Sequence, residues 1–257
     1  MNKEKQKLSV LIITLNEELH IQSLLEDLDF ADEIIVVDSF SNDKTVSIIE
    51  GFQNVKLIQN KFVNYTSQRN FALDQAKYSW ILFLDADERL TPDLKNEILS
   101  KINHSDPASA YLIYRTFMFK NVKLNFSGWQ TDKIFRLFNK SKCRYAEERF
   151  VHEKLNVDVT IAVLKHKLIH YSYADYADYK LKMKNYGVLK AQEKQRKGQK
   201  SSFLLMVFHP LYSFLYRFLI RLGFLDGIKG IIICYLNAYS ILIRYKELRR
   251  LTTSSRI

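Results

Sequence analysis

The sequence predicts an α/β fold: a mainly parallel β-sheet flanked by helices, followed by a basic, amphipathic helical region at the C-terminal end. Three runs of mostly apolar residues, 8–14, 33–38 and 80–84, lack the polar alternation of a half-exposed strand. Such runs are typical of strands that are covered on both faces. Helical patterns separate the runs, and this alternation indicates parallel strands joined by right-handed crossovers.

The elements of the first half follow one another in a regular order. We expect strands at 8–14, 33–38, 55–59 and 80–84, with helices around 21–28, 46–49 and 66–76. In the first helix the apolar residues recur at three- and four-residue intervals, which gives the helix one apolar face. Thr91 is a predicted N-cap and Pro92 the first residue of a fourth helix.

Acidic residues stand where two of the predicted strands end. Asp38 closes the second strand, and Asp85, Asp87 and Glu88 follow the fourth. Ligands of open α/β sheets bind outside the carboxyl ends of the strands. Asp85 and Asp87 lie two positions apart, so in an extended segment they point to the same side. They could share a Mg²⁺-like ion completed by substrate phosphates, or form a solvated acidic turn.

Asp38 has two interpretations. Its carboxylate could accept hydrogen bonds from a ribose or a base edge, or it could cap the polar loop that follows. The dinucleotide fingerprint G-x-G-x-x-G and the P-loop G-x-x-x-x-G-K-[ST] are both absent from the sequence. Their absence disfavours an NAD enzyme and a P-loop NTPase.

Residues 109–175 differ in character from the first half. Further strands are predicted at 109–119, 133–138, 157–163 and 167–171. Between the second and third of these lies the segment E-E-R-F-V-H-E, residues 147–153, which lacks the repeat of a helix. We expect a loop over the sheet edge, and loops on rigid scaffolds often carry catalytic residues.

The excess of positive charge lies at the C-terminal end. Residues 178–257 hold 16 Lys and Arg against 4 Asp and Glu, whereas residues 1–177 hold 23 against 24. Apolar helical patterns at 203–224 and 228–243 lie within this basic region. Apolar helices with basic flanks are typical of segments that lie in a membrane interface. The alternative is a helical hairpin packed on the catalytic domain, and we place the domain boundary after residue 175.

Together these motifs resemble the family 2 glycosyltransferases. The matching segments are L-I-I-T-L-N-E-E, I-I-V-V-D-S-F-S-N-D-K-T, Q-R-N-F-A-L-D-Q-A and W-I-L-F-L-D-A-D-E-R-L-T-P, followed by R-L-F-N and V-H-E. Within the family the sequence is most similar to the bacterial lipopolysaccharide core β-1,4-glucosyltransferases. The resemblance covers about residues 8–155, with a looser likeness at G-F-L-D-G-I-K-G.

The resemblance implies the Rossmann-like GT-A fold, a UDP-sugar donor, a Mg²⁺ or Mn²⁺ ion and inversion at the anomeric carbon. It also assigns residues of this chain to the donor site. The first-strand loop beside the nucleotide would contain Thr14, Asn16 and Glu17. Asp38 would bind the base and ribose, and Arg69 would approach the nucleotide from its helix. Asp85 would contact the ribose or the metal, and Asp87 would hold the metal that bridges the diphosphate.

The resemblance does not assign the catalytic base to one residue, because many family members place the base in an E-D pair that this chain lacks. Glu153 of V-H-E is the first candidate, and Glu148 and Glu147 are alternatives. His152 would complete the metal shell or contact the diphosphate. Trp129 would stack on a sugar face or belong to the core.

The basic tail predicts a membrane-linked acceptor, such as a lipopolysaccharide core or a polyprenyl-linked glycan. Residues 176–257 would bind the anionic cytoplasmic face of the bacterial inner membrane as a peripheral or monotopic segment. Other acceptors are capsular polysaccharide or protein. A sugar-1-phosphate nucleotidyltransferase would need a Gly-rich loop after the first strand, which is absent. A nucleic-acid-binding protein is disfavoured because the basic residues flank large apolar blocks.

Overall fold

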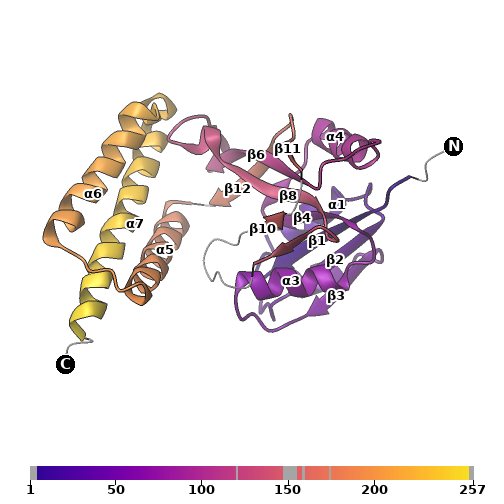
Figure 1. Ribbon diagram of the computed structural model, residues 1–257, viewed down its shortest axis with the longest axis horizontal. Coiled ribbons are helices and arrows are strands. Elements are labelled where there is room, and N and C mark those ends of the chain that lie inside the picture. Colours follow the sequence, from indigo (N-terminus) through magenta and orange to yellow (C-terminus); the bar gives the residue numbers. More distant parts are fainter. Residues whose placement is uncertain (1–4, 120, 147–154, 158–159, 174, 255–257) are drawn as a thin grey trace. The chain divides into compact units, whose positions relative to one another are not determined.

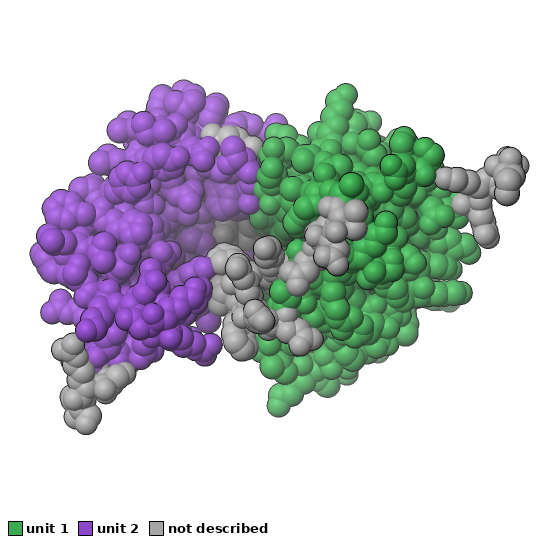
Figure 2. Space-filling model, in the orientation of Figure 1, with its two compact units in different colours: residues 1–115, 133–170 green, residues 116–132, 171–257 purple. Residues whose placement is uncertain are grey.

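A computed structural model describes residues 5–119, 121–146, 155–157, 160–173 and 175–254 of the protein. The chain divides into two compact units, coloured separately in Figure 2. Unit 1 comprises residues 1–115 and 133–170, and unit 2 comprises residues 116–132 and 171–257. The division predicted after residue 175 stays a prediction.

The predicted α/β fold is confirmed in unit 1. Its parallel strands are β1 (Leu8–Thr14), β2 (Glu33–Asp38), β3 (Val55–Gln59) and β4 (Trp80–Asp85). They lie in the order β3-β2-β1-β4, and β4 then pairs antiparallel with β8 (Lys133–Asn139). The bounds of the first four strands match the sequence prediction closely, and β1, β2 and β4 are almost continuous apolar runs.

Helices cover both faces of this sheet, which is why its strands lack polar alternation (Figure 1). The helices are α1 (Ile21–Glu26), α2 (Thr45–Glu50), α3 (Tyr65–Gln75) and α4 (Pro92–Ile102). Side chains of α1 and α4 pack with Val10, Val36 and Leu82 in one core cluster. Side chains of α3 pack with alternate residues, Leu11 and Phe83, in the cluster on the opposite face.

The rest of unit 1 departs more from the sequence prediction. The strand expected at 157–163 is divided between β10 (Leu155–Val157) and β11 (Ile161–Val163). β10 pairs with the unpredicted β9 (Cys143–Tyr145), and β11 pairs with β6 (Ala110–Phe119). The two-residue strand β5 (Glu88–Arg89) was also unpredicted and pairs with β12 (Leu168–Tyr173). These short strands depend on non-local pairing, so no local pattern marks them.

Glu97 of α4 joins that helix to the turn before β12. Its carboxylate accepts hydrogen bonds from the backbone N–H groups of Lys165 at 2.8 Å and His166 at 2.9 Å, and lies 3.0 Å from His166 Nδ1. Partial burial alone would raise the pKa of Glu97, but these hydrogen bonds outweigh burial and lower that pKa below its ordinary value. The carboxylate therefore stabilises the fold above about pH 4.5 and loses this effect as the pH falls through its folded pKa.

We expect Glu97→Gln to lower the free energy of unfolding at pH 7 by about 1–2 kcal/mol, because an amide replaces a charged acceptor. The difference from wild type should be constant between about pH 7 and 5 and shrink below about pH 4.5. Urea unfolding at a series of pH values measures it. A difference that grows at low pH would contradict the assignment.

Unit 2 consists mainly of three long helices that lie side by side (Figure 1). They are α5 (Tyr176–Arg196), α6 (Phe203–Leu215) and α7 (Gly227–Ser254). The single helix expected at 203–224 is interrupted, because α6 is followed by a π-helical segment, Tyr216–Ile220, and a short 3-10 helix, Gly223–Asp226. Leu222 between them has a left-handed backbone, with φ of 56°.

The loop that contains Asn125 and Phe126 is hydrogen-bonded to the segment between α6 and α7. The carboxylate of Asp226 accepts hydrogen bonds from the backbone N–H groups of Asn125 and Phe126, each at 3.0 Å. Gly230 packs so closely on the Gly223 carbonyl that a Cβ would lie 1.8 Å from its oxygen. The motif G-F-L-D-G-I-K-G therefore has a structural role in building this turn.

Candidate active site

The parallel strands bring three of the predicted donor-site residues to one edge of the sheet. In the β1–β2 register Thr14 lies opposite Asp38, and in the β1–β4 register Ile13 lies opposite Asp85. Thr14, Asp38 and Asp85 thus lie at the carboxyl ends of adjacent strands, where ligands of open α/β sheets bind. Thr14 Oγ1 is buried and has no hydrogen-bond partner among the described residues.

Asp38 is fully buried and holds the loop that follows β2. It accepts hydrogen bonds from the backbone N–H and the hydroxyl of Ser41, and one of 3.4 Å from Gln59 Nε2. The structure therefore shows the loop-capping interaction directly, and the role of Asp38 in binding a base or ribose stays a prediction.

The loop after β1 is tied to the loop after β2. The Asn16 side chain accepts a 2.9 Å hydrogen bond from Asn42 N–H, and the Glu17 N–H donates to Thr45 Oγ1 at 2.8 Å. Asn16 has φ of 56°, a left-handed conformation that asparagine tolerates better than most residues. These contacts hold the two loops together above the strand ends, and the nucleotide contacts predicted for Asn16 and Glu17 stay predictions.

Asp85 lies between two arginines. Its Oδ1 is 2.9 Å from Arg69 Nη2 on α3, and its Oδ2 contacts Arg136 Nη2 on β8. Burial alone would raise the pKa of Asp85, but Arg136 and Arg69 outweigh burial and hold that pKa well below its ordinary value. Asp85 is therefore ionised at neutral pH, and both of its oxygens already contact guanidinium groups.

Glu88 is the centre of a buried ion-pair cluster that the sequence analysis did not identify as such. Its side chain is fully buried, and Oε1 lies 2.7 Å from Arg136 Nη2 and 3.7 Å from Arg115 Nη1. Oε2 accepts a 3.0 Å hydrogen bond from the backbone N–H of Asp85. Burial raises the pKa of Glu88, although Arg136 opposes that shift. Glu88 thus fixes the turn that carries the two aspartates.

Asp87 faces a histidine that the sequence analysis did not single out. Asp87 Oδ2 lies 3.3 Å from His170 Nε2, and both side chains are less than one-fifth exposed. The pairing of β5 with β12 sets His170 opposite Glu88 in the register, which brings the imidazole to this turn. The one signal in the sequence was that His170 stands near the end of the strand predicted at 167–171.

The remaining predicted site residues lie outside the described part of the chain. These are Glu147, Glu148, His152 and Glu153. Trp129 is described, and its ring stacks on Phe117 at a centroid distance of 3.9 Å within the core of unit 2. That packing favours the core interpretation of Trp129.

The donor set at Asp87 fits a divalent cation. A carboxylate oxygen and an imidazole nitrogen lie within 3.3 Å of each other at a partly exposed turn. An imidazole beside a carboxylate suits Mn²⁺ better than Mg²⁺, which takes oxygen ligands. In the part of the chain that the structure describes, no group of three His, Cys, Asp or Glu side chains is placed to hold a metal. Further ligands would have to come from Asp85, the diphosphate, water or the V-H-E segment.

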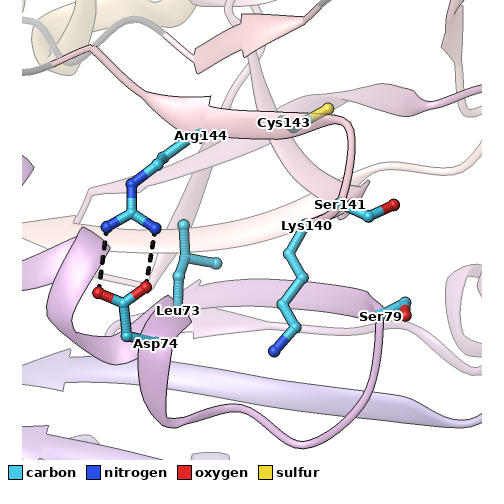
Figure 3. A pocket seen from close by; sticks show the side chains of 7 residues that line it. All are labelled: Leu73, Asp74, Ser79, Lys140, Ser141, Cys143 and Arg144. Atoms are coloured by element: carbon cyan, nitrogen blue, oxygen red, sulfur yellow. Dashed lines mark hydrogen bonds and ion pairs between the residues drawn. The ribbon is translucent and has the colours of Figure 1, made fainter.

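A hollow of about 300 Å³ lies elsewhere in unit 1 (Figure 3). It is lined by Ser79, which precedes β4, and by Lys140 and Arg144 beyond β8. Asp74 and Arg144 face each other across it through hydrogen bonds of 2.7 and 3.0 Å. Because Ser79 is at the amino end of β4, this hollow is at the other end of the strand from Asp85.

Comparisons with known proteins agree with the predicted class. A sequence profile described as Glycosyl transferase family 2 matches residues 9–157. An uncharacterized glycosyltransferase of Rickettsia bellii is 31% identical over 258 residues, covering 96% of this chain and 87% of the relative. The lipopolysaccharide core biosynthesis glycosyltransferase LpsC of Rhizobium meliloti is 26% identical and covers 94% of each chain. A crystal structure of S. aureus TarS aligns with a TM-score of 0.48 at 18% identity, covering 98% of this chain and 91% of that one.

Proposed function

The chain belongs to glycosyltransferase family 2, and we propose that it is a metal-dependent, inverting hexosyltransferase. It moves glucose or a related hexose from a UDP-sugar to a membrane-linked glycan such as a lipopolysaccharide core. The observation that carries this proposal is the pairing of Asp87 with His170 beside the arginine-bound Asp85, at the carboxyl ends of the parallel strands.

A nucleotide-sugar donor is supported by the sequence relatives as well as by the site. The S. aureus poly(ribitol-phosphate) β-N-acetylglucosaminyltransferase TarS is 32% identical over 113 residues, and a TarS structure contains UDP-GlcNAc. In this chain the loop beyond β1 and β2 would receive the nucleoside. Thr14, Asn16, Glu17 and Asp38 are the proposed contacts, and the unpartnered Thr14 hydroxyl supports that assignment.

Asp87 and His170 are the proposed metal ligands. A divalent cation held there would supply positive charge that offsets the charge developing on the leaving diphosphate. Asp85 is proposed to contact the ribose or metal from a fixed position, since Arg69 and Arg136 hold both of its oxygens. Glu88 positions this turn through the N–H of Asp85 and does not reach the donor.

Glu153 is the proposed general base, with Glu148 as the alternative. The base takes the proton of the acceptor hydroxyl as that oxygen attacks the anomeric carbon, and the sugar–phosphate bond breaks on the opposite side. This single displacement inverts the anomeric configuration. His152, adjacent to Glu153 in sequence, is proposed to contact the metal or the diphosphate.

A membrane-linked acceptor is supported by unit 2. The segments Phe203–Ile220 and Gly223–Thr253 are apolar and long enough to cross a membrane by length and composition, and are 11% and 28% buried. In α6 only Pro210 is buried, whereas Phe203, Leu204 and Phe208 are more than half exposed. Residues 176–257 are therefore proposed to bind the anionic cytoplasmic face of the inner membrane. Flotation of the protein with lipid vesicles tests this part of the proposal. A protein that binds neither neutral nor anionic vesicles would contradict it.

The named function of the relative LpsC supports a lipopolysaccharide core acceptor over a polyprenyl-linked or capsular glycan. A nucleic-acid partner is not proposed, because the basic residues of unit 2 adjoin the exposed apolar side chains of α6.

The proposal is tested by measuring UDP release from a panel of UDP-sugars with Mg²⁺, Mn²⁺ or EDTA. We expect slow hydrolysis of one UDP-hexose, faster with Mn²⁺ than with Mg²⁺ and abolished by EDTA. Hydrolysis that persists undiminished in EDTA would contradict the metal assignment. Release of UDP from none of the sugars would contradict the donor class.

A further inference from the structure

A second hollow lies in unit 2, at the interruption between α6 and α7. It has a volume of about 200 Å³ and is lined by residues of the α6 C-terminal half, the π-helical segment and the loop at Gly128. Its lining residues are Gly128, His209, Tyr212, Ser213, Tyr216, Arg217 and Arg221. The lining thus combines two guanidinium groups, two phenols, a hydroxyl and an imidazole, and contains no carboxylate.

The first arginine, Arg217, is held in place by the loop at Ser127 and Gly128. Arg217 Nη1 donates a 2.9 Å hydrogen bond to the backbone oxygen of Ser127. Gly128 leaves the space that this requires, since a Cβ there would lie 2.9 Å from Arg217 Nη1. The loop itself is fastened by Asp226 and by a 3.0 Å hydrogen bond from Ser127 N–H to the Arg221 carbonyl.

The second arginine, Arg221, directly follows the π-helical segment. Its guanidinium lies over the Tyr216 ring at 5.6 Å from the centroid. Short π-helical turns occur often at functional sites. Arg221 immediately follows the π-helical turn Tyr216–Ile220 and lies four positions after Arg217, and both arginines line the hollow.

The helical segments that line the hollow also carry exposed apolar side chains. Leu211 and Leu215 of α6 and Leu219 and Ile220 of the π-helical segment are 43–69% exposed. A ligand of this hollow would therefore meet both positive charge and a large apolar surface. Of the common anions, a lipid phosphate offers both properties, since its oxygens match the guanidinium fork and its chains match the apolar surface.

We propose that the hollow formed by Arg217, Arg221, Tyr212 and Tyr216 binds the phosphomonoester headgroup of an anionic membrane lipid, because a monoester offers three acceptor oxygens and nearly two negative charges to the two guanidinium groups. The phosphate oxygens accept hydrogen bonds from the two guanidinium groups, and the acyl chains lie along the exposed side chains of α6. This inference rests on the proposed membrane association of unit 2 and adds a specific headgroup site to it.

The test compares Arg221→Gln with the control Lys200→Gln. Lys200 is exposed and outside the hollow, just before α6, so both variants remove one positive charge from unit 2. Flotation is measured with full-length protein and vesicles of neutral lipid containing either phosphatidic acid or phosphatidylglycerol, matched for surface charge. Melting curves verify that both variants are folded.

We expect Lys200→Gln to weaken binding to both kinds of vesicle by about fivefold or less, the effect of one nonspecific charge. Arg221→Gln should weaken binding to phosphatidic acid vesicles by roughly 20-fold or more, as expected for a lost hydrogen-bonded ion pair. Its effect on phosphatidylglycerol vesicles should match that of the control. Equal effects of the two variants on phosphatidic acid vesicles would overturn the site.

Inorganic phosphate distinguishes a lipid from a free anion. We expect the wild-type protein to stay bound to phosphatidic acid vesicles in millimolar inorganic phosphate. Release of the protein from these vesicles by phosphate would overturn the lipid assignment. UDP release by Arg221→Gln reports separately on the proposed glycosyl transfer and should equal that of wild type. Wild-type protein that binds no vesicles would refute the membrane association itself, and this site with it.

Discussion

Asp87→Ala should reduce UDP release from the preferred UDP-sugar by roughly 100- to 1000-fold, the loss expected when a cation's several kcal/mol of charge stabilisation disappears. The Asp87 side chain is 19% exposed, and its carboxylate lies 3.3 Å from His170. Without the Asp87 carboxylate, only the His170 imidazole of this proposed pair of metal ligands remains. The fold should persist, because Asp87 lies outside the buried Glu88–Arg136 contact.

The matched control is Asp29→Ala. Asp29 belongs to the same unit, its side chain is 85% exposed, and its nearest cation, Lys95, lies 4.0 Å away. We expect this control to retain the rate of the wild type. Steady-state UDP release at saturating Mn²⁺ compares the three proteins. Equal rates for Asp87→Ala and wild type would remove Asp87 from the donor site.

Arg136→Met should lower the free energy of unfolding by roughly 3–5 kcal/mol, because breaking a buried ion pair leaves uncompensated charge. The Arg136 side chain is 1% exposed and contacts both Asp85 and the fully buried Glu88. Methionine fills much of the volume but cannot replace these contacts. Urea unfolding measures the loss.

The comparison for this prediction is Arg144→Met, which also removes an arginine from an ion pair in unit 1. Arg144 and Asp74 are each 54% exposed, and exposed pairs contribute about 0–1 kcal/mol. The two variants should therefore differ by several kcal/mol. A similar small loss in both would show that Glu88 and Asp85 find other partners or protonate at little cost. Adding Glu88→Leu to Arg136→Met should recover part of the lost stability.

The sheet and the first pair of acids could be predicted because their signals are local. Residues 80–84 form a continuous apolar run, Asp85 ends the strand, and Asp87 stands two positions later. In the same way, Thr91 and Pro92 mark the start of α4, where the Thr91 hydroxyl accepts a hydrogen bond from Leu94 N–H. Such features depend on residues only a few positions apart, so the sequence displays them without knowledge of the fold.

Glu88, Arg136 and His170 were not predicted as one site because only tertiary structure brings them together. Arg136 belongs to an alternating strand and looks like a solvent-facing position, yet it is buried against Glu88 across the sheet. His170 reaches Asp87 through the pairing of β12 with the two-residue β5, which no periodicity encodes. The interruption of α6 was missed because the residues after Leu215 remain mostly apolar, so the sequence gives no local sign that the helix ends there.

The central claim is that Asp87 and His170 hold a divalent cation together with the donor diphosphate. It is tested most directly by electron paramagnetic resonance of free Mn²⁺ during titration of the wild type and of Asp87→Ala, with and without UDP. We predict that the wild type takes up Mn²⁺ more tightly when UDP is present and that Asp87→Ala does not. Equal, UDP-dependent uptake by both proteins would contradict the claim and place the cation on other residues.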